Sequence, residues 1–318
     1  MRAYILESLD RAPAIVDVPE PSVGDDEVLV RVQAASVNPI DEAIATGGVS
    51  DWMDYEFPVT LGRDLAGSVE RVGSAVTRFR VGDPVFGYIA KPVAHDGSFA
   101  EYVVVPEDQF IVHRPEGVDA QQAGAFGLAS VTALMCIEAT GVAAGDILLI
   151  NGATGGVGSY AIQIAKARGV HVIASARPGD EEEHVRALGA DEAVDWSAGD
   201  LVGVVRGTHP DGIHGLVDVV TPTPEAFAEL AKGILAPGGR TATTRGVGDP
   251  EMLGEIENTN VFSMPDTALM AQIGELAGIG KLRAPVAEVH DFERIEDAFA
   301  ALSRGAVGKI GIAFGDGS

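Results

Sequence analysis

The chain has 318 residues, more than a typical single domain, so its length predicts two domains. Hydrophobic residues make up 46% and charged residues 22%, which is ordinary for a folded globular protein and excludes disorder of the chain as a whole. Its 22 Lys and Arg face 47 Asp and Glu, and the resulting net charge of -25 excludes nucleic acids and anionic membranes as general partners.

The first 121 residues contain short strand-like segments separated by turn signals. Strands are predicted at residues 28–37 (VLVRVQAASV), 66–72 (AGSVERV) and 101–105 (EYVVV), with turns at 82–84 (GDP) and 96–97 (DG). Helical periodicity is scarce in this region, so we predict a mainly antiparallel β domain.

From about residue 120, short apolar strands alternate with helix-length segments. A helix is predicted at 129–139, where Cys136, the one cysteine of the chain, is expected to be a buried and unreactive thiol; nucleophilic catalysis is the alternative. The alternation continues with a strand at 147–151, a helix at 157–168, a strand at 170–174, a helix at 180–188, a strand at 216–220, a helix at 224–234 and strands at 240–244 and 260–263. Such repetition predicts a doubly wound parallel sheet that binds a nucleotide.

The tail from residue 266 predicts a helix, a strand at 285–289, a helix at 292–302 and a strand at 309–314. Residues 1–10 lack the charged and apolar regions of a signal peptide, and no run approaches the roughly 18 apolar residues of a membrane span. We therefore expect a cytoplasmic protein without a membrane partner.

The strongest motif is the glycine-rich turn NGATGGVG at 151–158. It follows an apolar strand and opens an amphipathic helix, which is the context that a dinucleotide-binding turn requires. Gly155 lets the backbone approach a pyrophosphate, and Gly158 lets the helix pack closely on its strand. Free N–H groups at the start of the helix attract phosphate. We expect the dinucleotide to be held by Thr154, Gly155, Gly156 and Val157; a tight structural turn is the alternative.

Cofactor choice depends on the end of the following strand. NAD-binding proteins usually carry an acidic residue there for the ribose 2′-OH, but this chain reads Ala174-Ser175-Ala176-Arg177 with no acid before Asp180. Arg177 suits a 2′-phosphate, and the Ser175 hydroxyl supplies a further donor. We therefore predict NADP(H) as cofactor, with a solvated surface role as the alternative for Arg177.

Seven motifs follow one another over almost the whole chain. They are ASVNPID at 35–41, LGRDLAG at 61–67, GDPV at 82–85, GSFAEY at 97–102, NGATGGVG at 151–158, LGAD at 188–191 and GKI at 308–310. In this order they resemble the zinc-independent quinone oxidoreductase (zeta-crystallin-like) branch of the medium-chain dehydrogenase/reductases. The resemblance implies an α/β protein with a GroES-like, mainly antiparallel β catalytic domain at 1–121, completed by 266–318, and a Rossmann-like NADP(H)-binding domain at 122–265. The cleft between them would hold the nicotinamide and the substrate.

The same resemblance predicts that zinc is absent. Zinc-dependent relatives carry Cys where this chain has Asn38, His-Glu where it has Arg63-Asp64, and a third ligand near Leu128; their four-cysteine structural lobe is missing. Catalytic zinc needs three N, S or O ligands, and the seven histidines show no close metal-binding pair in the sequence. We therefore predict no metal site and disfavour a zinc-dependent alcohol dehydrogenase.

Without zinc, the simplest chemistry is hydride delivery to an electron-poor acceptor such as a quinone or an α,β-unsaturated carbonyl. By resemblance, Asn38 and Asp41 are the predicted catalytic residues, which would lie beside the nicotinamide and organise that edge of the pocket, with a loop-capping pair as the alternative. The resemblance also places Thr132, Val220 and Thr244 beside the cofactor and Trp196 near its adenosine end, with ordinary packing as the alternative for Trp196. Some relatives have a tyrosine proton donor beyond the Asn-Pro motif; it is missing here, which leaves Tyr55 or solvent as candidates.

Two other functions remain open. One is an enoyl-thioester reductase, which would need a long acyl channel. The other is a non-catalytic NADP(H)-binding protein that acts as a sensor or structural protein. The resemblance suggests a homodimer, with the predicted strand at 260–263 as a candidate edge, and the natural substrate cannot be deduced from the sequence.

Overall fold

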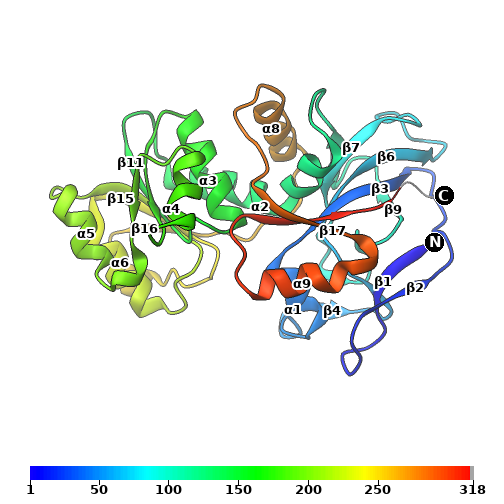
Figure 1. Cartoon of the computed structure of the whole chain (residues 1–318), viewed down its shortest axis with the longest axis horizontal. Coiled ribbons are helices and arrows are strands. Elements are labelled where there is room, and N and C mark those ends of the chain that lie inside the picture. Colours follow the sequence, from blue (N-terminus) through cyan, green and yellow to red (C-terminus); the bar gives the residue numbers. More distant parts are fainter. Residues whose placement is uncertain (316–318) are drawn as a thin grey trace. The chain divides into compact units, whose positions relative to one another are not determined.

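The computed structural model describes residues 1–315, and the chain divides into two compact units (Figure 1). Unit 1 contains Met1–Ala129 and the C-terminal part of the chain from Met264, and unit 2 contains Ser130–Ser263. The predicted boundary between residues 121 and 122 falls in the first turn of helix α2 (Ala120–Thr140), whereas the two units separate after residue 129.

Unit 1 is built on a mainly antiparallel sheet to which both parts of the chain contribute. Its strands follow the order β10-β7-β6-β3-β18-β17, and β9 also pairs with β3. Strand β3 (Glu27–Val37) buries Val28, Val30 and Val32 in an apolar core, as alternation along a strand with one buried face requires. The last strand, β18 (Lys309–Ala313), runs antiparallel to β3 with Ile312 opposite Ala35, so the C-terminal segment completes the sheet.

The other strands of this sheet are β6 (Asp64–Val72), β7 (Pro84–Tyr88), β9 (Tyr102–Pro106), β10 (Ile111–His113) and β17 (Val286–Asp291). The elements of unit 1 outside it are β1 (Arg2–Leu6), β2 (Ala14–Asp17), α1 (Pro39–Ala45), β4 (Asp54–Tyr55), β5 (Val59–Thr60), β8 (Val93–Ala94), α8 (Thr267–Gly278), the 3-10 turn η2 (Phe292–Arg294) and α9 (Ile295–Ser303).

Helix α2 contains a break at Gly127, where φ is 23° and ψ is -127°. A Cβ atom at this position would lie 2.0 Å from Asp64 Oδ1, so the close approach of the Asp64 carboxylate requires glycine. Against the sequence prediction, α2 is long and apolar enough to cross a membrane, but 78% of its apolar window is buried inside the structure. That burial is the mark of a core helix.

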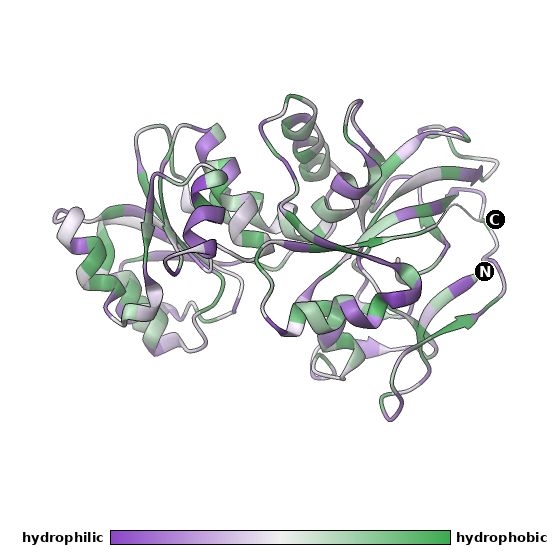
Figure 2. Cartoon of the chain, in the orientation of Figure 1, coloured by the Kyte–Doolittle hydropathy of each residue, from purple (hydrophilic) through white to green (hydrophobic). Residues whose placement is uncertain are grey.

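Unit 2 is a doubly wound sheet of six parallel strands. The strands follow the order β13-β12-β11-β14-β15-β16, so the chain adds strands first on one side of β11 and then, from β14, on the other. The carboxyl ends of β11 and β14 flank this switch point, where nucleotide-binding sheets hold their ligands. Helix α6 buries Phe227, Leu230 and Ile234, and hydrophobic and hydrophilic residues alternate along it in Figure 2.

The elements of unit 2 follow the expected alternation. They are β11 (Ile147–Asn151), α3 (Gly156–Ala167), β12 (His171–Ser175), α4 (Asp180–Ala187), β13 (Glu192–Val194), the 3-10 turn η1 (Trp196–Ala198), α5 (Leu201–Thr208), β14 (Ile213–Asp218), α6 (Pro224–Ile234), β15 (Leu235–Thr243), α7 (Pro250–Leu253) and β16 (Glu257–Asn260).

Several predicted elements have other limits in the structure. The strand predicted at 216–220 is β14 (Ile213–Asp218), and the strand predicted at 240–244 is β15 (Leu235–Thr243). The strand predicted at 260–263 lies earlier, at β16, where the polar sequence Glu-Asn-Thr-Asn gives no apolar alternation because an edge strand has one neighbour only. The helix predicted at 292–302 begins with the η2 turn and becomes α-helical at Ile295.

Candidate active site

The glycine-rich turn joins β11 to α3 in unit 2. A Cβ atom on Gly158 would lie 2.3 Å from the Gly152 carbonyl oxygen, so the helix packs on its strand only with glycine there. At Gly155 the nearest atom to a Cβ is 3.8 Å away, so packing inside the protein does not require this glycine. Gly155 is the N-cap of α3 and no side chain caps it, which leaves the first amide N–H groups of the helix without intrahelical acceptors. Such a cradle fits a pyrophosphate.

The neighbouring predicted residues are available at this turn. Thr154, Gly155, Gly156 and Val157 are all partly exposed. Ser175, at the end of β12, is buried, and its hydroxyl oxygen accepts the Gly152 amide N–H at 2.9 Å. Ser175 therefore fixes the turn, and its hydroxyl proton can still be donated.

Arg177 and Trp196 meet at a third residue that sequence reasoning missed, Glu181. The Arg177 Nε donates to Glu181 Oε1 at 2.8 Å, and the Trp196 indole donates to Glu181 Oε2 at 3.2 Å. The Arg177 guanidinium also lies over the Trp196 ring, 5.4 Å from its centroid. An acidic side chain therefore does lie close to the end of β12. It belongs to the first turn of α4, four residues after Arg177, and not to the strand end itself.

The carboxyl ends of β14 and β15 carry the next group. Asp218 is fully buried and accepts hydrogen bonds from Asn151 Nδ2 at 2.8 Å and from the backbone amide of Val220 at 3.0 Å. The Val220 side chain is exposed, and the Thr244 amide donates to the Asp218 carbonyl at 3.3 Å. Asp218 is thus a missed residue that organises the predicted strand-end positions; an aspartate inside the apolar run LVDVV is the signal that could have found it. Thr132, on α2 in unit 2, is buried.

In unit 1 a buried network forms around Asp64. The Lys309 ammonium lies 2.6 Å from Asn38 Oδ1 and 3.2 Å from Asp64 Oδ2, with both charged side chains buried. Asn38 Nδ2 donates to Asp64 Oδ2 at 2.9 Å, and the Leu128 amide donates to Asp64 Oδ1 at 2.7 Å. The fold therefore brings together Asn38, Asp64 and Leu128, which are remote in the sequence, and adds Lys309 to them. Asp64 and Lys309 were seen only as parts of motifs, although a charge inside an apolar strand is itself a signal.

This donor set does not fit catalytic zinc. One amide oxygen and one carboxylate are directed at an ammonium group that already supplies the positive charge, and no cysteine or histidine belongs to the network. The Asn38 amide is committed on both sides, since its oxygen accepts from Lys309 and its nitrogen donates to Asp64.

Asp41 is the third residue of α1 and is completely buried. Its Oδ2 accepts the Asn38 backbone N–H at 2.8 Å, whereas Oδ1 has no hydrogen-bond partner among the described residues. Burial, and secondly the nearby Asp64 carboxylate, raise the pKa of Asp41 to about 7, against the opposing effect of Arg63. Asp41 therefore caps the start of α1, as the loop-capping alternative predicts for it. The Asn38 side chain instead contacts Asp64 and Lys309 in the buried network.

Neither Tyr55 nor Cys136 is placed for chemistry. The Tyr55 hydroxyl donates to the Ile44 carbonyl at 2.8 Å, so its proton is engaged inside the protein. Cys136 is fully buried, and burial raises the pKa of its thiol to about 12, as expected for an unreactive core cysteine.

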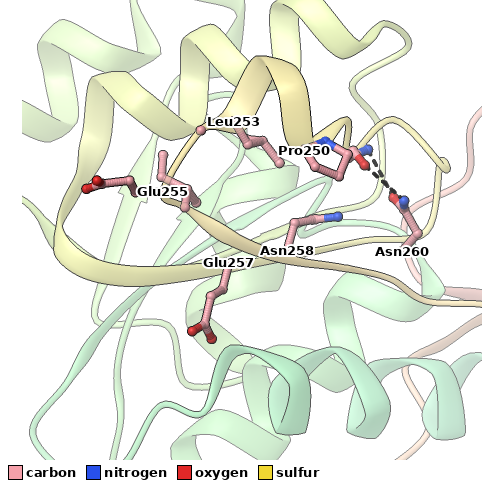
Figure 3. A pocket seen from close by; sticks show the side chains of 9 residues that line it. Pro250, Leu253, Glu255, Glu257, Asn258 and Asn260 are labelled. Atoms are coloured by element: carbon pink, nitrogen blue, oxygen red, sulfur yellow. Dashed lines mark hydrogen bonds between the residues drawn. The ribbon is translucent and has the colours of Figure 1, made fainter.

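A hollow of about 370 Å³ lies between α7 and β16 (Figure 3). The Asn260 side chain ties its rim by accepting the Gly248 N–H at 3.0 Å and donating to the Gly248 carbonyl at 3.1 Å. None of the predicted site residues lines this hollow.

Comparison with known proteins agrees with these two units. Residues 24–116 match the alcohol dehydrogenase GroES-like domain, and residues 156–273 match the zinc-binding dehydrogenase family. A quinone-oxidoreductase homolog of spinach chloroplasts is 31% identical over 93% of this chain and 92% of the relative. The chain belongs to the quinone oxidoreductase branch of the medium-chain dehydrogenase/reductase family. It is therefore an α/β oxidoreductase with a GroES-like domain and a Rossmann-like domain that binds a nicotinamide dinucleotide.

Other members of the family differ in their named cofactors. A chloroplast protein of Arabidopsis thaliana named NADPH-dependent alkenal/one oxidoreductase is 30% identical over 91% of this chain and 72% of the relative. The solved quinone oxidoreductase of Coxiella burnetii has a TM-score of 0.86 and 25% identity over 98% of this chain and 99% of that one. A solved NAD-dependent alcohol dehydrogenase has a TM-score of 0.87 and 29% identity over 99% of this chain and 100% of that one.

Proposed function

We propose that this oxidoreductase transfers hydride from NADPH to a quinone or an α,β-unsaturated carbonyl and uses no zinc in that reaction. The observation that carries the proposal is the Lys309 ammonium among Asn38, Asp64 and the Val37 carbonyl. A site without a Lewis acid to polarise an alcohol or a simple carbonyl suits an acceptor that spreads the incoming charge onto its own oxygen.

The proposed cofactor residues belong to unit 2. Thr154, Gly155, Gly156 and Val157 would hold the pyrophosphate at the start of α3, and Ser175, Arg177 and Trp196 would bind the adenosine end. Thr132, Val220 and Thr244 would contact the nicotinamide end. When bound, the reduced nicotinamide supplies the hydride.

The preference for NADPH is supported by Arg177 and by the named activity of the Arabidopsis relative. The 2′-phosphate would share the guanidinium with the Glu181 carboxylate, which competes for the same positive charge. This competition limits the preference, and the existence of an NAD-dependent structural relative makes the cofactor comparison an essential measurement.

Asn38 and Asp41 act as positioning residues in this proposal. Asn38 links Lys309 to Asp64, and Asp41 holds the start of α1 through the Asn38 amide. Because the Asp41 side chain is fully buried and the Tyr55 proton is engaged, solvent is the proposed proton source. A cytoplasmic location and a homodimer complete the proposal; fractionation and sedimentation would test them, since several relatives are chloroplastic or mitochondrial.

The first experiment follows NADPH oxidation with a small quinone and a small enone, compares NADH in parallel and repeats each assay with a chelator. We expect turnover that prefers NADPH and is unchanged by the chelator. Loss of activity in chelator while the protein remains folded by circular dichroism would contradict the zinc-free reaction, and a preference for NADH would contradict the cofactor assignment. Tight NADPH binding without turnover of either acceptor would favour the sensor alternative.

A further inference from the structure

Two histidines and a glutamate lie near the amino-terminal ends of the parallel strands of unit 2, whereas the glycine-rich turn lies at their carboxyl ends. His171 is the first residue of β12, Glu192 is the first residue of β13, and His209 directly follows α5. Their side chains are partly buried, with 38%, 29% and 15% of the surface exposed. The glycine-rich turn follows the carboxyl end of β11, so the two groups lie at opposite ends of these strands.

The three potential ligand atoms converge. Glu192 Oε1 lies 2.6 Å from His171 Nε2 and 2.9 Å from His209 Nε2, and all three atoms lie within 4.8 Å of one another. The imidazole rings are 6.0 Å apart at an angle of 65°, so neither ring stacks on or blocks the other. Ligand atoms around tetrahedral zinc are separated by roughly 3.3 Å, because each lies about 2.0 Å from the metal. The separations of 2.6, 2.9 and at most 4.8 Å would therefore change by roughly 0.4 to 1.5 Å to admit an ion.

A second carboxylate lies near the His171 ring. Asp191 Oδ2 lies 3.8 Å from His171 Nδ1, on the side of the ring away from Glu192. Asp191 is itself held by Lys166 Nζ at 2.7 Å and by the Val172 amide at 2.7 Å. At 3.8 Å this contact is longer than a hydrogen bond, whereas Glu192 Oε1 accepts the His171 Nε2–H at 2.6 Å, so a metal ion must displace that proton.

We propose that His171, Glu192 and His209 bind one divalent transition metal ion, with Zn²⁺ as the best match. Two imidazoles and one carboxylate suit zinc, and water would complete a tetrahedral set. The ion would join β12, β13 and the segment after α5, so its role is to stabilise unit 2. The sequence showed no close histidine pair because α4, β13, η1 and α5 separate His171 from His209. This site is independent of the hydride chemistry proposed above.

The test is a titration of the chelator-treated, dialysed full-length protein with Zn²⁺ and, separately, with Co²⁺. We expect one ion per chain, an intense visible absorption for bound Co²⁺ and a Tm that rises by several degrees with Zn²⁺. His171→Gln and His209→Gln should each weaken Zn²⁺ binding at least tenfold. His214→Gln is the matched control, since His214 is an exposed histidine of the same unit outside the cluster, and it should bind as the unsubstituted protein does.

Glu192→Gln provides a second route if a histidine variant fails to fold, because the amide oxygen can still accept both imidazole N–H groups while the ligand charge is lost. It should also weaken Zn²⁺ binding at least tenfold. Absence of binding, or binding that all four variants retain or lose equally, would overturn the proposal. NADPH oxidation measured on the same samples is a separate readout, so failure of the proposed hydride transfer would leave the metal result intact.

Discussion

Lys309 shows how a single residue can connect the two parts of the chain that form unit 1. Its side chain is 3% exposed, and its ammonium lies between oxygen atoms of Asn38 and Asp64. A buried pair of this kind contributes little compared with a well-packed apolar pair, but removal of one partner leaves the other charge buried and uncompensated.

Lys309→Met should therefore lower the free energy of unfolding by about 3 to 5 kcal/mol, as urea denaturation would measure. The double variant Lys309→Met with Asp64→Asn should recover part of this loss, because no uncompensated charge remains. Lys281→Met, at an exposed position, is the control and should change stability little. Equal effects at positions 281 and 309 would show that the buried network is unimportant for stability.

Arg177 and Glu181 form the second residue-scale test. Glu181→Gln frees the guanidinium from a competing carboxylate, so the ratio of NADPH affinity to NADH affinity should rise about threefold to tenfold. Arg177→Ala should lower the same ratio. Fluorescence titration with both reduced cofactors measures it, and a ratio unchanged in both variants would remove Arg177 from the cofactor site.

Asp41 gives a pH dependence with a defined sign. Its folded pKa of about 7 exceeds the ordinary carboxyl value near 3.9, so the folded protein holds a proton that the unfolded chain releases between these values. The stability contributed by protonated Asp41 is complete below pH 4 and is lost as the pH rises through 7, by at most roughly 4 kcal/mol. Asp41→Asn removes the titrating carboxyl group. The free energy of unfolding of this variant, relative to that of the unsubstituted protein, should therefore increase from pH 4.5 to pH 7.5. A constant difference in urea unfolding across that range would contradict the raised pKa.

At the scale of elements, the connection between β11 and α3 makes the sharpest demand on residue type. Gly158 stands where a Cβ atom would overlap the backbone of Gly152 and Ala153. Relief of this overlap requires α3 to move away from the sheet.

Gly158→Ala should destabilise the protein by about 2 kcal/mol or more and weaken dinucleotide binding, because the phosphate cradle moves with the helix. Gly207→Ala is the matched control: a Cβ there meets no atom within 4 Å, and alanine favours the helical backbone of α5. Thermal unfolding should show a lower Tm for the first variant and an equal or higher Tm for the second. The reverse order would refute the packing argument.

Sequence patterns predicted elements best where apolar residues alternate in a complete run. Strand β11 and helix α6 were placed with their observed limits because buried strands and amphipathic helices repeat their pattern along the chain. The edge strand β16 was misplaced because its sequence, Glu-Asn-Thr-Asn, is polar throughout and shows no apolar alternation. Helices α5 and α7 were not predicted, since segments of eight and four residues are too short to carry a clear periodic signal.

At the scale of the whole molecule, the two-unit α/β fold could be predicted, and the contacts of the site only in part. The glycine-rich turn was found because its spacing is local. Glu181 lies four residues after Arg177 and Asp218 two residues before Val220, so these two partners were within local reach and were overlooked. The partner of Asn38 could not be deduced, because Lys309 is 271 residues away and meets it only through folding. The same reason explains why His171 and His209 were judged to be unrelated.

The pairing of β18 with β3 has a consequence for cotranslational folding. Unit 2 is one uninterrupted stretch, Ser130–Ser263, so all of its strands exist well before synthesis ends. The sheet of unit 1 must wait for residues 309–313, and until they emerge the edge of β3 that later receives β18 stays open. The Asp64 carboxylate likewise waits for its counter-charge. A chain that lacks residues 309–313 would thus contain a complete nucleotide-binding unit attached to a sheet with an open edge on β3.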